Sequence, residues 1–177
     1  MPVRVVMEGG PYPGLARADV LQRARAMLDT LGLSKSELSI LLTGDEQMRI
    51  LNRLYRKKDR PTDVLAFSQR EGELAARAGR LLGDVVISIP TARRQADARG
   101  QELRSEVAML LAHGLLHLLG WDHVTAAEDR RMRKETARLC LAAAKRSLAR
   151  APARPEAKTG ASVHRVSPPG RARRRSP

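Results

Sequence analysis

The chain has 177 residues, a length that suits one domain with a continuous hydrophobic core. Its longest apolar runs fall short of the about 20 residues that a membrane-spanning helix needs. Arg4 and Glu8 interrupt the N-terminal segment, which argues against a secretory signal peptide. Cys140 is the single cysteine, so an internal disulfide and a thiolate metal cluster are excluded. We therefore expect a cytoplasmic protein with no membrane partner.

The charge balance is strongly basic, with 33 Lys and Arg against 19 Asp and Glu and a net charge of +14. A charge of this size predicts an anionic partner, of which nucleic acid is the commonest. Residues 150–177 carry half of it, since they hold eight Lys and Arg and one Glu. The chain has only four aromatic residues, so an aromatic platform like that of an RNA-recognition sheet is not expected. Contacts to phosphates should therefore dominate any binding to nucleic acid.

The first third of the chain predicts two strands and two helices. VRVVM at 3–7 has the pattern of a strand, and apolar residues recur at helical spacing over 17–31. LSILLT at 38–43 has the length of a strand. A second helix follows, and either Thr43 or Asp45 is suited to cap its start.

The middle of the chain predicts two further strands and a helix. VLAF at 64–67 and LLGDVVISI at 81–89 are rich in strand-forming residues. The polar segment between them is expected to be a loop. Pro90 suits the first turn of a short helix, which should end near Gly100.

Two longer helices are expected next. One runs from about residue 102 into a segment rich in histidine, and its apolar residues recur at helical spacing. Thr125 and Glu128 have the spacing of a capping box, which predicts the start of a last helix. That helix should continue to about Ala149.

After residue 149 the composition shifts to Pro, Ala, Arg, Ser and Gly, with almost no large apolar side chain. Such a segment cannot offset its ordering entropy by burial. We therefore predict one domain over 1–149 and a disordered basic tail over 150–177. Since strands and helices are interspersed, the expected class is α+β, a small mixed sheet of about four strands with about five to six helices. Short connections near 31–38 and 68–80 allow antiparallel pairs in that sheet.

HGLLHLLGWDH, at 113–123, holds three of the four histidines. His113 and His117 are four residues apart, so on a helix both rings can reach one metal ion. His123 can join them only if the helix ends and the chain turns back. Gly120 is where such a turn is easiest, because glycine takes left-handed backbone angles.

Three neutral imidazoles suit a Zn²⁺ ion whose fourth position stays open, as in catalytic zinc sites. The alternative is that the three histidines are ordinary core or surface residues without a ligand. The glycine placed to turn the chain between His117 and His123 disfavours this alternative. The spacing also matches the metalloprotease pattern H-E-x-x-H-x-x-G-x-x-H, except that Gly114 replaces the catalytic Glu. A protease would lack its general base, whereas cleavage of a phosphodiester depends more on a metal and an arginine.

At this point three motifs support a resemblance to a known family. HGLLHLLGWDH closely resembles the H-G-x-L-H-L-x-G-[YW]-D-H signature of the YbeY family, bacterial endoribonucleases involved in ribosomal RNA maturation. LNRLYRKKDRPTDVLAF at 51–67 resembles the family's L-N-x-x-Y-R-x-K-D-x-P-T-D-V-L-S-F segment, with Ala66 at the usual Ser. LLGDVVIS at 81–88 resembles its L-G-D-I-x-I strand. The resemblance covers about Leu38 to Leu141.

The resemblance implies a single-domain α+β fold with one zinc ion on His113, His117 and His123. It implies cleavage of single-stranded RNA, with Arg56 as the functional arginine that faces the metal. Its associated biology is 3′-end maturation of 16S ribosomal RNA and ribosome quality control. The implied partners are the small ribosomal subunit and assembly proteins, and DNA is not expected as a partner.

Several charged neighbours have two interpretations each. Lys57, Lys58 and Arg60 either follow the RNA backbone or face water. Asp122 either orients a ligand histidine or braces the turn after Gly120.

Structural roles are favoured for three other residues. Asp63 is expected to be a capping or turn carboxylate, and Glu106 a solvated helix carboxylate. Trp121 is expected to anchor the turn by packing.

Two rival functions stay open at this point. One is a metal-stabilised RNA-binding assembly factor with little catalysis. The other is a metalloprotease-like hydrolase, against which Gly114 counts.

Overall fold

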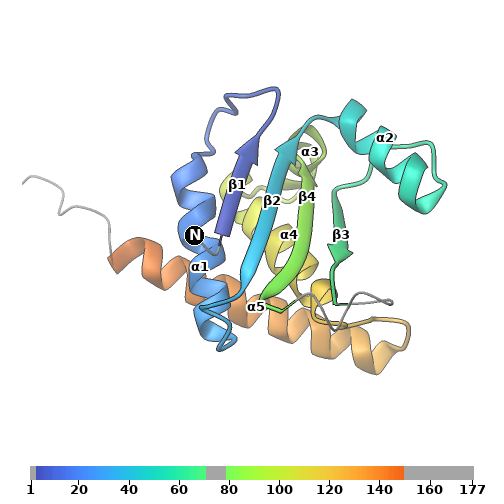
Figure 1. The fold of residues 1–177 in the computed structure, drawn as a ribbon. Helices are drawn as coiled ribbons and strands as arrows, with labels where there is room; N and C mark the ends of the chain where they lie inside the picture. Colours follow the sequence, from blue (N-terminus) through green and yellow to red (C-terminus); the bar gives the residue numbers. More distant parts are fainter. Residues whose placement is uncertain (1–2, 71–78, 150–177) are drawn as a thin grey trace, which may run out of the picture.

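The computed structural model describes residues 3–70 and 79–149, so the tail predicted over 150–177 lies outside the described residues. Every strand and helix expected from the sequence within these ranges is present, with ends close to those predicted (Figure 1). In chain order the elements are β1 (Val3–Met7), α1 (Arg17–Thr30), β2 (Glu37–Thr43), α2 (Asp45–Arg56), β3 (Val64–Ser68), β4 (Leu81–Ser88), α3 (Ile89–Ala98), α4 (Leu103–Leu118) and α5 (Ala126–Ala149).

The four strands form one mixed sheet in the order β1-β2-β4-β3, which confirms the predicted α+β class. β1, β2 and β4 are parallel, and among the described strands only β3 and β4 pair antiparallel. The prediction that the connection near 31–38 allows an antiparallel pair is therefore wrong, since β2 pairs parallel with β1. That connection follows α1, and a helix that crosses over between neighbouring strands returns the chain in the same direction. β3 is left as an edge strand.

The two faces of the sheet are covered unequally. α1 and α4 pack on one face, and α5 packs on the outer side of both (Figure 1). On the opposite face, within the described residues, only α2 contacts the strands, where it forms a small cluster of Met48, Leu65 and Val86. None of the described helices combines the length and apolar character needed to cross a lipid bilayer.

α4 is the central helix, and it is apolar on nearly every side because the sheet and α5 enclose it. Glu106 lies on this helix and is only 1% exposed, so the expectation of a solvated carboxylate is wrong. Arg99 Nη1 lies 2.6 and 2.8 Å from its two oxygens. Arg99, which follows α3, thus supplies the counter-charge that a buried carboxylate requires.

The start of α2 also differs from expectation. Gly44 is the N-cap residue, and neither Thr43 nor Asp45 caps the helix with its side chain. Asp45 instead joins α2 to the start of α3. Its carboxylate accepts hydrogen bonds from Ser88 Oγ (2.5 Å), Thr91 Oγ1 (2.7 Å) and Arg94 Nη2 (2.9 Å). Partial burial alone would raise the pKa of this carboxyl, but these donors outweigh it and hold the pKa below its ordinary value.

Candidate metal centre and cavity

α4 ends in the turn that the sequence predicts. Gly120 has φ +80°, the left-handed conformation that glycine adopts at low cost. Its N–H donates to the His117 carbonyl at 3.0 Å, and the Trp121 N–H donates to the Leu116 carbonyl at 3.1 Å. This pair of bonds is the Schellman motif, which satisfies the last carbonyls of a helix and reverses the chain. His123 is thereby returned to the face of α4 that carries His113 and His117.

The three rings converge on one point. One ligand nitrogen from each of His113, His117 and His123 lies within 4.8 Å of the other two. The Nε2 atoms of His113 and His117 are 3.2 Å apart. Ring centroids are separated by 4.7 to 5.6 Å. These spacings bring three nitrogens around a volume the size of one metal ion.

Their protonation also suits a metal. Burial, followed by the neighbouring rings of His117 and His123, lowers the pKa of His113. Burial and then His123 lower the pKa of His117, and the positive charge of Arg56 acts in the same direction. Lowered pKa values favour the neutral imidazole, which is the form that binds a metal ion. The geometry and the chemistry of this donor set therefore both fit a divalent cation such as Zn²⁺.

Gly114 has a packing role in the structure. It is buried where α4 crosses the sheet, and a Cβ added there would lie 2.8 Å from Val85 Cγ1 and 3.2 Å from Val64 Cγ2. Real Cβ atoms essentially never show a separation under 3.0 Å. A glutamate at this position would have to enter the contact between α4 and the sheet. The catalytic base of the metalloprotease pattern is thus excluded by packing as well as by sequence.

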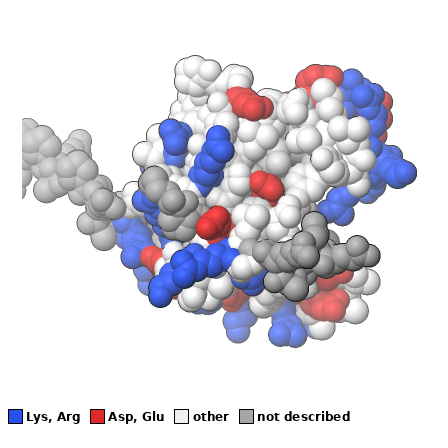
Figure 2. All heavy atoms as spheres, in the orientation of Figure 1, with Lys and Arg blue, Asp and Glu red and all other residues white. Residues whose placement is uncertain are grey.

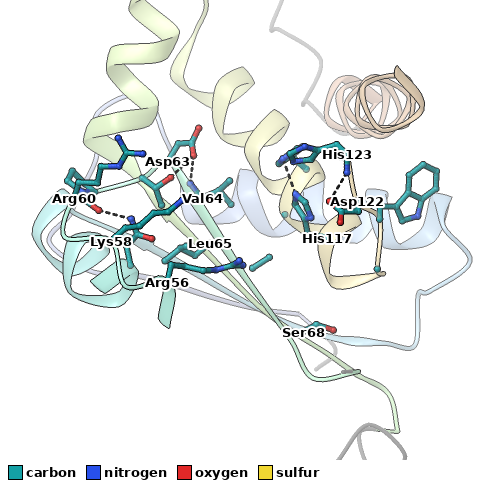
Figure 3. Close-up of a pocket in the computed structure, with 18 residues that line it drawn as sticks. Arg56, Lys58, Arg60, Asp63, Val64, Leu65, Ser68, His117, Asp122 and His123 are labelled. Atoms are coloured by element: carbon teal, nitrogen blue, oxygen red, sulfur yellow. Dashed lines mark hydrogen bonds between the residues drawn. The ribbon is translucent and has the colours of Figure 1, made fainter. Parts of the chain in front are cut away.

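The histidines form one wall of a cavity of about 780 Å³. Figure 3 shows His117, His123 and Asp122 on one side, and Arg56, Lys58 and Arg60 on the other. The free edge of β3 lies between the two walls and contributes Val64, Ala66 and Ser68 to the lining. We call the two sides the histidine wall and the cation wall.

The cation wall consists of Arg56, Lys58 and Arg60. Among the described residues none of these three side chains forms an ion pair, whereas Arg53, on the same helix as Arg56, lies 4.0 Å from Asp59. Lys57 is not brought into the cavity. It takes φ +58° and ends α2 directly after Arg56, so its contact with RNA stays a prediction. The structure therefore separates the three backbone candidates into two that line the cavity and one that does not.

Two residues that sequence reasoning did not single out hold the cavity in shape. Asn52 is 3% exposed, and its Nδ2 donates to the Arg60 carbonyl at 2.7 Å, which fixes the loop after α2. Ser68 Oγ donates to the Leu118 carbonyl at 3.2 Å and thus ties the end of β3 to the end of α4. A signal for Asn52 was present in the sequence, because Asn52 follows Met48 by four residues and so lies on the apolar face of the helix, where a buried amide needs a hydrogen-bond partner.

The carboxylates beside the histidines are engaged by the chain itself. Asp63 accepts hydrogen bonds from Val64 N at 2.8 Å and from Gln95 Nε2 at 3.1 Å, in agreement with the turn role expected for it. Asp122 accepts from His123 N at 2.7 Å, so it braces the turn before the third histidine. Trp121 is half-buried and packs against the core, with the Arg131 guanidinium 5.8 Å from its ring centroid.

The fold and the site together define an α+β domain in which three converging histidines lie opposite an arginine. Comparison with known proteins finds relatives of this chain. The family model Endoribonuclease YbeY matches residues 16–143. Endoribonuclease YbeY of Synechococcus sp. (strain JA-2-3B'a(2-13)) is 50% identical over 121 residues, which cover 65% of this chain and 74% of the relative. Endoribonuclease YbeY of Anaeromyxobacter dehalogenans (strain 2CP-C) is 47% identical over 144 residues, 80% of this chain and 72% of the relative.

The chain belongs to the YbeY family, which confirms the resemblance seen in its motifs. The solution structure of TM1509 from Thermotoga maritima superposes with a TM-score of 0.57 at 20% identity, covering 83% of this chain and 92% of that one. At this level of identity the likeness concerns the fold alone.

Proposed function

We propose that this protein is a zinc-dependent endoribonuclease that cleaves single-stranded RNA in the 3′-end maturation of 16S ribosomal RNA and in ribosome quality control. The observation that carries the proposal is the placement of Arg56 in the same cavity as His113, His117 and His123. Membership in the Endoribonuclease YbeY family supports the reaction class. The proposed partners, the small ribosomal subunit and its assembly proteins, and the proposed cytoplasmic location rest on the family resemblance.

Each wall of the cavity has a separate task in this proposal. The three histidines would hold zinc, which supplies Lewis-acid stabilisation of the phosphate and activates the attacking nucleophile. Arg56 donates hydrogen bonds from its guanidinium to the non-bridging oxygens of the scissile phosphate and offsets the charge that develops there. Lys58 and Arg60 neutralise the phosphates that follow along the strand.

Among the described residues of the cavity, Gly114 stands where a metalloprotease carries its catalytic glutamate, and the carboxylates of Asp63 and Asp122 each accept a hydrogen bond from the backbone. This arrangement favours a phosphodiester over a peptide bond, because amide hydrolysis needs a base that passes a proton to the leaving amine. Attack by water and attack by the neighbouring 2′-hydroxyl give different products. A 2′,3′-cyclic phosphate on the product indicates the second route.

The direct test is metal analysis of the purified protein together with cleavage of single-stranded and double-stranded RNA of one sequence. We expect one zinc per chain, cleavage of the single strand only, and loss of cleavage in Arg56→Ala and His113→Ala. If ribosome maturation in cells continues with His117→Ala while RNA binding persists, the protein acts as an assembly factor. If casein is cleaved and RNA is not, the protein is a metalloprotease-like hydrolase.

A further inference from the structure

A second hollow, of about 920 Å³, lies on the open face of the sheet beside α2. Arg56, Ala66 and Ser68 line both this hollow and the catalytic cavity, so the two meet at the edge strand β3. From there the second hollow crosses the sheet as far as Arg4 on β1. We call it the sheet groove. A single strand of RNA whose phosphate is held at Arg56 in the cavity can therefore continue along the protein surface into the sheet groove.

The sheet groove contains an exposed aromatic side chain at the point where it meets the cavity. Tyr55 is 63% exposed although it is large and apolar, and it precedes Arg56 in α2. Its ring meets that of Phe67 edge to face, with 4.8 Å between centroids and 63° between planes. Phe67 thus supports the Tyr55 ring from one side while most of the ring stays accessible. A supported, accessible aromatic ring is the feature on which nucleic-acid bases stack.

The charges of the sheet groove differ from those of the cation wall. Among the described residues that line it, Arg4 and Arg56 are balanced by Glu8 and Asp84. Figure 2 shows this face, where the surface over the strands is mostly uncharged and Lys and Arg side chains gather over α2. A groove of balanced charge suits the uncharged bases of a strand better than its phosphates. The carboxylate of Asp84 can in addition accept a hydrogen bond from a base amino group.

We propose that the sheet groove holds the bases of single-stranded RNA that flank the cleaved phosphodiester, with one base stacked on Tyr55. The inference rests on the proposed function, because it assigns the continuation of that substrate. It also explains how a chain with few aromatic residues selects single strands. Bases paired in a duplex face one another and cannot reach an aromatic ring beside the phosphate site.

The test compares Tyr55→Ala and Tyr55→Phe with Leu54→Ala, since Leu54 is similarly exposed at 66% on the same helix but lines neither hollow. Binding to zinc-loaded protein is measured with a long 2′-O-methyl single strand that carries 2-aminopurine, and with a short oligonucleotide that fills only the catalytic cavity. We expect Tyr55→Ala to weaken binding of the long strand about 10-fold, as loss of one stacked base does, and to abolish quenching of 2-aminopurine. Tyr55→Phe and Leu54→Ala should bind the long strand as tightly as wild type does. The short oligonucleotide should bind Tyr55→Ala and wild type with equal affinity.

Two results would overturn the inference. If Tyr55→Ala binds the long strand as tightly as Leu54→Ala does, RNA does not occupy the sheet groove, and a protein partner becomes the remaining occupant. If Tyr55→Ala changes the dependence of binding on salt, the loss is electrostatic and stacking is wrong. Failure of the proposed function can be distinguished from both results. In that case the wild-type protein would cleave unmodified RNA neither as the long single strand nor as the short oligonucleotide.

Discussion

The two walls of the cavity are built in different ways. The histidine wall comes from one continuous segment, since α4 and the turn at Gly120 place all three rings. The cation wall comes from the end of α2 and the loop after it, and that loop is held by Asn52. His113 and His117 are half-buried in a packed helix, whereas Arg56 is exposed. Local sequence thus encodes the proposed metal site, while the position of the arginine depends on the rest of the fold.

The largest expected effect comes from the histidine wall. His117→Ala removes one of three converging nitrogens, so we expect loss of bound zinc and a fall in RNA cleavage of roughly 1,000-fold or more. Metal analysis and cleavage of single-stranded RNA measure both. His164 belongs to the segment 150–177 that the sequence predicts to be a tail, so His164→Ala is the matched control. Full cleavage by His117→Ala would separate the histidine wall from the reaction.

The cation wall should fail in a different way. Arg56→Ala should lower cleavage about 100- to 1,000-fold, as removal of one preorganised donor does, and zinc content should not change. Arg53→Ala is the control, because Arg53 lies on the same helix but outside the cavity. If Arg56→Ala also lost zinc, the two walls would not be independent.

The packing beneath the histidine wall can be tested through stability. Gly114→Ala should lower the free energy of unfolding by about 1 kcal/mol, since overpacking against Val85 exceeds the gain in helix propensity. In the Val85→Ala background the same change should cost less, because its closest contact is gone. Urea denaturation of the four proteins in this cycle measures the coupling. Equal costs in both backgrounds would show that Val85 does not set the requirement for glycine.

The smallest effect is expected at Asp45, the first residue of α2, the helix whose last residue is Arg56. Asp45→Asn should lower the free energy of unfolding by about 0.5 kcal/mol at pH 7, because the amide keeps an oxygen that can accept from Ser88 and Thr91 but loses the charge that strengthens these hydrogen bonds. The pKa of Asp45 is lower in the folded state than its ordinary value of 3.8, so this stabilisation is present above that pH. It should be lost as the pH falls through the folded-state value.

Chemical denaturation at pH 7 and at pH 2 measures the difference between wild type and Asp45→Asn. Asp97→Asn, an exposed change on α3, is the control. A difference that grows toward low pH would contradict the assignment, since the sign of the linkage would be reversed.

The sequence predicted those features that depend on neighbouring residues. The turn at Gly120 and the capping box are of this kind: Thr125 N donates to Glu128 Oε2 at 2.8 Å, and Glu128 N donates to Thr125 Oγ1 at 3.2 Å. Features that depend on distant residues were missed. Either Thr43 or Asp45 was expected to cap α2, but the Asp45 carboxylate instead accepts hydrogen bonds from Thr91 and Arg94 of α3. Glu106 was expected in solvent because nothing in the sequence placed Arg99 beside it.

The same reasoning accounts for the strand pairing and the sheet groove. Parallel pairing of β1 with β2 follows from how α1 packs, which the length of a connection does not specify. Tyr55 and Phe67 meet only because α2 lies across the edge of the sheet. With four aromatic residues in the chain, composition argued against an aromatic platform like that of an RNA-recognition sheet, and it could not show that two of the four rings meet.

The turn at Gly120 has a consequence for the way the two longest helices are joined. His113 and His117 belong to α4, whereas His123 lies in the short segment that leads into α5. An ion that binds all three rings would therefore link α4 to the segment that leads into α5, in addition to the side chains packed between the two helices. Its binding free energy is then also free energy of folding, so the thermal midpoint should rise with the concentration of free zinc. A chelator should correspondingly lower the thermal midpoint.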